Sequence, residues 1–112
     1  MDLGDFIEFC EHLQGSEACF PFDDRVLVYK YNTKMYAFAD TLNFSRINVK
    51  CEAEKAIELR ERYPEITPGF HMNKKYWNTL STQGNLSDSL IQQMIKDSYM
   101  LIVNSKKSRK KG

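Results

Sequence analysis

The stretch VLVYKYNTKMYAFADTLNFSRINVKC, residues 26–51, has the pattern of a small sheet. It contains three runs rich in β-branched and aromatic residues, which are typical of strands: residues 26–31, 35–40 and 44–51. The first two runs flank Asn32-Thr33, which is close to a two-residue hairpin loop, although the glycine usual in such turns is missing. The third run alternates, with Ile47, Val49 and Cys51 on one side and Arg46, Asn48 and Lys50 on the other. We therefore expect a sheet with one buried face and one polar, basic face.

Helix patterns surround this block. Residues 3–13 form an apolar stripe with Asp2 as N-cap and Gly15 as a stop, and residues 53–63 form a second helix that ends before Pro64. Residues 15–24 have the composition of a loop, and residues 66–82 predict two short strands with an irregular point at Pro68-Gly69. A last helix is expected from about Asp88 to Asn104, with Ser87 as its N-cap.

The order of these elements predicts an α+β fold, α-β-β-β-α-β-β-α, with an antiparallel meander sheet. The chain length of 112 residues fits a single domain, which we expect at residues 1–104. Residues 105–112, SKKSRKKG, carry too few apolar side chains to pack, so we expect a basic, disordered C-terminal tail. Without the five bases of this tail, 11 bases face 15 acids, a net charge of −4. The body is therefore not basic as a whole, and nucleic-acid contacts require a local basic surface or the tail.

Several classes of protein are disfavoured. The sequence has no apolar run long enough to span a membrane and no basic leader, so we expect a cytoplasmic protein that does not enter the membrane. Cys10, Cys19 and Cys51 show no paired spacing and are expected to be reduced thiols. Phosphate-binding loops and hydrolase motifs are missing, and His12 and His71 lie far apart, so we expect no cofactor, no metal site and no enzymatic activity.

The densest group of basic and aromatic residues is HMNKKYW, residues 71–77. Such interleaving can hold a phosphate and stack a base. The alternative is a hairpin in which Trp77 belongs to the core and the lysines face water. The same two alternatives apply to the basic tail.

This cluster resembles a motif of the MmcQ/YjbR family of small bacterial proteins, and its most specific element is formed by His71, Asn73, Lys74 and Trp77. Weaker matching pieces extend over about residues 5–104: Pro21-Phe22, Lys34-Met35, Phe38-Ala39, Val49-Lys50, Leu59-Arg60-Glu61, Pro68-Gly69, Leu86-Ser87-Asp88 and Ser98-Tyr99. The resemblance implies an α+β fold of the kind seen in secretion chaperones. It also implies the DNA binding through a pair of hairpin wings that has been suggested for members of the family.

We therefore expect a DNA-binding module whose side chains position phosphates. The candidate contacts are Lys30, Lys34, Arg46, Lys50, Lys74, Lys75 and Tyr76. The alternative is a non-catalytic module that binds a protein partner, a second copy of itself or a small ligand through an apolar surface. A continuous positive strip on the structure would favour nucleic acid, whereas an apolar groove would favour a partner.

Overall fold

The computed structural model of the chain describes residues 1–69 and 72–111, with side chains described as far as Ser105. In chain order the elements are α1 (Leu3–Glu11), β1 (Ser16–Cys19), β2 (Val26–Tyr31), β3 (Lys34–Asp40), β4 (Arg46–Lys50), α2 (Ala53–Arg62), β5 (Ile66–Pro68), β6 (Trp77–Ser81) and α3 (Asp88–Lys111). The strands form one antiparallel sheet in the order β1-β2-β3-β4-β6-β5. The expected α+β class and antiparallel meander are confirmed.

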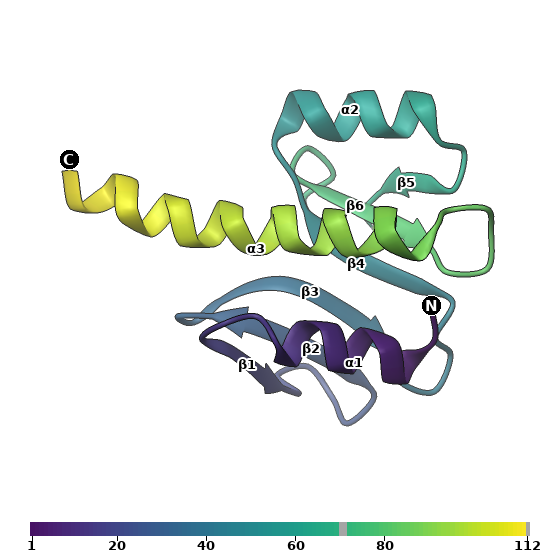
Figure 1. Cartoon of the computed structure of the whole chain (residues 1–112), viewed down its shortest axis with the longest axis horizontal. Coiled ribbons are helices and arrows are strands. Elements are labelled where there is room, and N and C mark those ends of the chain that lie inside the picture. Colours follow the sequence, from purple (N-terminus) through teal and green to yellow (C-terminus); the bar gives the residue numbers. More distant parts are fainter. Residues whose placement is uncertain (70–71, 112) are drawn as a thin grey trace.

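The three helices share one face of the sheet. Figure 1 shows α3 lying across the strands between α1 and α2, with its C-terminal end extending beyond the sheet. The main core forms between these layers because inward residues of every helix join one cluster with inward residues of the strands. Phe6 of α1, Tyr36 of β3 and Ile95 of α3 are fully buried within it. Among the described residues, no helix is long and apolar enough to cross a membrane.

Ser98 connects α3 to the middle of the sheet through two hydrogen bonds. Its buried hydroxyl donates to the Tyr36 carbonyl oxygen at 2.6 Å and accepts the Lys50 backbone N–H at 2.8 Å. The Tyr99 hydroxyl donates to the Gln14 carbonyl oxygen, which adds a contact to the segment that follows α1. Because these bonds satisfy buried polar groups on both β3 and β4, they fix the position of α3 over the two strands.

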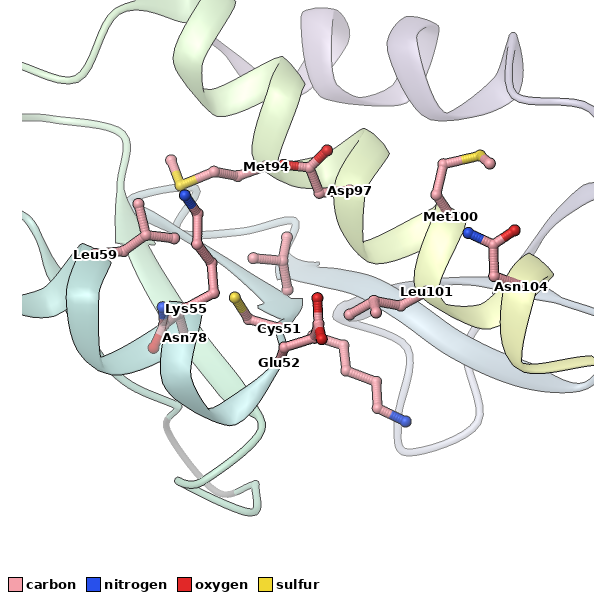
Figure 2. A pocket seen from close by; sticks show the side chains of 12 residues that line it. Cys51, Glu52, Lys55, Leu59, Asn78, Met94, Asp97, Met100, Leu101 and Asn104 are labelled. Atoms are coloured by element: carbon pink, nitrogen blue, oxygen red, sulfur yellow. The ribbon is translucent and has the colours of Figure 1, made fainter. Parts of the chain in front are cut away.

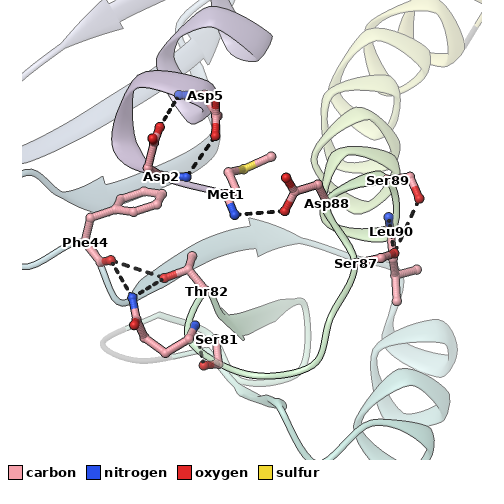
Figure 3. A network of polar contacts seen from close by, with 11 residues as sticks. Met1, Asp2, Asp5, Phe44, Ser81, Thr82, Ser87, Asp88, Ser89 and Leu90 are labelled. Carbon is pink, nitrogen blue, oxygen red and sulfur yellow. Dashed lines mark hydrogen bonds and ion pairs between the residues drawn. The ribbon is translucent and has the colours of Figure 1, made fainter.

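The amino-terminal end is held by a second polar network (Figure 3). Asp2 and Asp5 form a capping box at the start of α1, which confirms Asp2 as the N-cap. The Met1 ammonium lies 2.8 Å from Asp88 Oδ1 at the start of α3, and this contact raises the pKa of the amino group. The Ser87 hydroxyl accepts the Leu90 backbone N–H at 3.2 Å, as expected for the N-cap of α3.

The β2–β3 turn is a tight hairpin without glycine. Asn32 and Thr33 both have positive φ, at 53° and 74°, which is the backbone pattern of the type I′ turn. Asparagine tolerates this region, but threonine does so at a cost. The register shifts between Tyr29 and Lys30, so a bulge lies next to the turn.

Two expected boundaries were wrong. The segment expected as a loop at residues 15–24 contains β1, which forms because the outer edge of β2 offers unpaired backbone groups to Ser16–Cys19. α3 continues to Lys111, beyond the expected end at Asn104, because residues 105–111 contain neither glycine nor proline to stop a helix. The division into a domain at residues 1–104 and a disordered tail at 105–112 stays a prediction, since the side chains of residues 106–112 lie outside the described part.

Candidate functional site

The face of the sheet opposite the helices, here called the open face, is apolar at its centre. Val28, Phe38 and Trp77 form a second, smaller buried cluster there, separate from the main core. The ring centroids of Phe38 and Trp77 lie 5.6 Å apart, and Phe22, from the β1–β2 loop, meets Phe38 at 6.4 Å. The expected polar, basic face is therefore corrected: apolar side chains on both sides of β2 and β3 give the open face an aromatic centre.

The position of Trp77 is set by hydrogen bonds in the turn that precedes it. The Asn73 Oδ1 accepts the Lys75 N–H at 2.9 Å, and the Asn73 carbonyl accepts the Tyr76 N–H at 3.1 Å. Gly69 donates to the Trp77 carbonyl at 2.7 Å, and any Cβ at Gly69 would lie 2.5 Å from the Trp77 Cβ. Trp77 is 6% exposed, so its expected burial is confirmed. His71, the remaining residue of the family motif, lies outside the described residues.

The strand register gathers most of the candidate contacts at one end of the sheet. Lys30 pairs with Met35, and Lys50 pairs with Trp77. Directly opposite residues of an antiparallel pair share a face, so both lysines belong to the open face. Two strand spacings separate Lys30 from Lys50, about 10 Å.

The remaining contacts of this end come from one turn. Lys74, Lys75 and Tyr76 precede β6, where the Tyr76 carbonyl accepts the Cys51 N–H at 2.7 Å. We call this group the basic end: Lys30, Lys50, Lys74, Lys75 and Tyr76. All five side chains are partly or fully exposed. Lys34 does not join them, because it pairs with Tyr31, whose ring meets Tyr99 of α3 on the helix side of the sheet.

Sequence reasoning missed one cation beside the basic end. Arg60 of α2 donates to the Lys74 carbonyl at 3.2 Å, which brings a guanidinium next to the lysine turn. Two acids also lie close by: Glu17 pairs directly with Lys30 in the β1–β2 register, and Glu52 follows Lys50 by two residues. The basic end is thus a local positive surface with acids at its border.

Arg46 does not join this group. It pairs with Ser81 at the far end of β4, four residues or about 13 Å from Lys50. The Arg25–Asp40 ion pair, 2.5 Å between Nη2 and Oδ2, belongs to the same end of the sheet. The hydrogen bond from Arg25 lowers the pKa of the Asp40 carboxyl, so this acid is ionised and compensated.

A hollow of about 470 Å³ lies on the open face, from its centre to the end that holds Arg46 and Asp40. Its walls mix aromatic, aliphatic and polar side chains: Phe22, Val26, Phe38, Asp40, Asn43, Arg46, Asn48, Met72 and Thr79. On its buried side the Thr79 hydroxyl donates to Asn48 Oδ1 at 2.6 Å. This volume is within the range of small-molecule sites, about 300–1,000 Å³.

A second cavity, of about 270 Å³, lies between α2 and α3 (Figure 2). Lys55 of α2 and Asp97 of α3 border it from opposite helices, and Asn78 of β6 also lines it. Asn78 is 1% exposed, and its Oδ1 is a buried acceptor for which the described residues provide no hydrogen bond. Burial raises the pKa of the neighbouring Cys51 thiol, which makes it a poor nucleophile at neutral pH.

The described residues include histidine, cysteine and acidic side chains, the types that ligate metals or act as nucleophiles. No three histidine, cysteine or acidic side chains gather there as a metal site would require. Cys10, Cys19 and Cys51 are free thiols, and burial raises the pKa of Cys10 to about 12.

Comparison with known proteins supports the family resemblance. A family model described as YjbR matches residues 11–101. The "Uncharacterized protein YbdF" of Escherichia coli O157:H7 is 34% identical over 89 residues, 79% of this chain and 73% of the relative. The "Uncharacterized protein YjbR" of Escherichia coli K12 is 27% identical over 105 residues, 93% of this chain and 89% of the relative.

Solved structures agree with this result. A crystal structure from Deinococcus radiodurans is 35% identical with a TM-score of 0.83, covering 88% of this chain and 76% of that one. A crystal structure from Pseudomonas syringae is 26% identical with a TM-score of 0.77, covering 90% of this chain and 98% of that one. These names and titles assign no activity to the relatives.

Proposed function

This chain belongs to the YjbR family, and we propose that it binds nucleic acid through the basic end of its open face. The observation that supports the proposal is the strand register, which puts Lys30 of β2 and Lys50 of β4 on one face, with β3 between them, beside Lys74 and Lys75. The role assigned is binding, with no catalytic step. The expected compartment remains the cytoplasm, where free thiols such as Cys19 persist.

Lysine side chains are suited to a surface that binds phosphates. Each ammonium is a compact charge on a flexible stem, able to meet a phosphate without a fixed geometry. Contacts of this kind position nucleic acid without reading its sequence, and they release counterions, so affinity falls with salt. Arg46 is left out of the phosphate-binding group because of its distance from the basic end.

The test is a salt series of fluorescence anisotropy with labelled duplex and single-stranded DNA. We expect binding at about 50 mM salt, and a log K against log salt slope that flattens by about 0.9 on duplex for each phosphate-binding lysine that is removed. Lys50→Gln and the double variant Lys74→Ala/Lys75→Ala should each flatten it. Lys96→Gln, an exposed lysine on α3, is the matched control and should leave it unchanged. No binding by the full chain at low salt, or unaltered slopes in both variants, would overturn the proposal.

A second candidate function is binding of a small ligand or a protein partner at the cavity between α2 and α3. The buried Asn78 Oδ1 supports it, since a ligand N–H donor would complete its hydrogen bonding. Lys55 and Asp97 on opposite sides suit a small zwitterion, although Lys55 also lies 3.6 Å from Glu58. For a protein partner, including a second copy of the chain, the exposed Met100 at the cavity rim is an apolar contact.

Thermal melting with the common amino acids as probes tests this second function. A ligand of the cavity should raise the melting temperature of the wild type but not that of Asn78→Leu. Failure of every probe to move the wild-type transition, together with a monomeric mass in solution, would count against it.

A further inference from the structure

We infer that the nucleic acid bound at the open face is single-stranded and that the hollow lined by Phe22, Phe38 and Arg46 receives one unstacked base. The inference rests on the proposed function, because the basic end must hold the backbone that leads to this base. It adds what the lysines alone cannot give, namely the strandedness of the ligand.

The aromatic wall is the first reason. Phe22 is 58% exposed although it is a large apolar residue, and its ring meets Phe38 edge to face at 6.4 Å, with an interplanar angle of 77°. The Phe38 ring in turn packs on Trp77, with the two ring centroids 5.6 Å apart. A buried ring therefore lies behind the aromatic wall. Every base has a π-face, and stacking on such a ring is a main source of affinity for single strands.

Polar groups in the hollow suit a base rather than a purely apolar ligand. The Thr79 hydroxyl donates a hydrogen bond to Asn48 Oδ1 at 2.6 Å, and this bond fixes the orientation of the amide that lines the hollow. Arg46 provides a planar guanidinium, which can stack on a base. The acid in the wall, Asp40, is paired with Arg25 at 2.5 Å, so its repulsion of a polyanion is reduced.

Continuity with the basic end is the third reason. Asn48 lies two residues from Lys50 on the same strand, about 7 Å, and pairs with Phe38 across the sheet. A backbone held at Lys30 and Lys50 can therefore place a base directly over the Phe38–Asn48 pair. Bases of a duplex are stacked and paired, so a duplex cannot fill the hollow without extruding one of them.

The experiment compares oligothymidylate with a duplex of the same length, using anisotropy at low salt. The wild type should bind the single strand more tightly than the duplex. Phe22→Ala should weaken binding of the single strand by about five-fold or more and leave unchanged the weaker duplex binding, which the lysines alone supply. Phe22→Tyr keeps the ring and should restore the affinity. Ile57→Ala removes a residue of similar exposure, 53%, from α2 on the other side of the sheet and should change neither affinity. Because Phe22 is mostly exposed, its variants should keep the wild-type melting temperature.

A 5-iodouracil placed in the oligothymidylate tests the contact itself. Irradiation should cross-link the wild-type chain in the segment containing Phe22 or in that containing Phe38, as read by mass spectrometry. If Phe22→Ala binds the single strand as well as the wild type while Lys50→Gln weakens it, the inference is overturned and the proposed function stands. If neither single strand nor duplex binds the wild type, the proposed function itself has failed.

Discussion

Replacing Trp77 with alanine removes the largest side chain of the open-face cluster. Trp77 is 6% exposed and packs on Phe38, whose ring centroid lies 5.6 Å away. A buried tryptophan takes roughly 150–250 Å² out of water, and at about 25 cal/mol per Å² this stabilises the fold by about 4–6 kcal/mol. Alanine retains part of this burial, so we expect a loss of about 3–5 kcal/mol, the usual range for Trp→Ala in a core. The low end is favoured because the cluster borders a hollow into which water and Phe38 can move.

Urea unfolding followed by circular dichroism measures this loss. The free energy of unfolding of Trp77→Ala should fall by about 3 kcal/mol or more, and the melting temperature by roughly 4 °C for each kcal/mol in a chain of this size. Trp77→Phe should recover about half of the loss, and the exposed Ile57→Ala should cost almost nothing. A loss below about 1 kcal/mol for Trp77→Ala would refute the view that Trp77 is structural.

The buried polar groups and the charged C-terminal segment lead to three more expected outcomes. Thr79→Val leaves Asn48 Oδ1 without its buried donor, so the free energy of unfolding should fall by about 1–3 kcal/mol, whereas Ser81→Ala, at the partly exposed end of β6, should cost less. Because burial raises the pKa of Cys10 to about 12, its neutral thiol contributes full stability below about pH 8.5 and loses it as the pH rises towards 12. Urea titrations should therefore show stability falling above pH 8.5 by up to about 1.4 kcal/mol per pH unit for this group, with a smaller slope in Cys10→Ala; equal slopes would contradict the assignment. Truncation after Asn104 removes five bases and should flatten the salt dependence of duplex binding by up to about 0.9 per base without shifting the melting temperature, and a large drop in melting temperature would mean that residues 105–112 pack on the body.

The central part of the fold could be predicted because its signals are local. Alternation of apolar and polar residues marks Arg46–Lys50 as a strand, and Asp2 and Ser87 are recognisable caps. β1 gave no such signal, since SEAC is only four residues long, has no alternation of apolar and polar residues, and forms a strand only because the edge of β2 is available. Tertiary pairing here overrides local propensity.

The candidate site could be predicted only in part. Alternation places Arg46 and Lys50 on the same face, but only the register shows that Lys50 lies beside Lys30 and that Arg46 lies at the opposite end. The approach of Arg60 to the lysine turn and the packing of Phe22 on Phe38 depend on long-range geometry that no spacing in the sequence encodes. The aromatic centre of the open face had one visible signal, the apolar residues on both sides of β2.

Backbone amide chemical shifts measured during titration with oligothymidylate would locate a bound strand on the chain, and so test binding at the open face without any substitution. We predict that the largest changes fall on the basic end, at Lys30, Lys50 and residues 74–76, and extend to Asn48 beside the hollow. Amides of α1 and of the Lys96 turn of α3, on the opposite side of the sheet, should stay unchanged. Changes centred on α1 or α3, or no changes at low salt, would contradict binding at the open face.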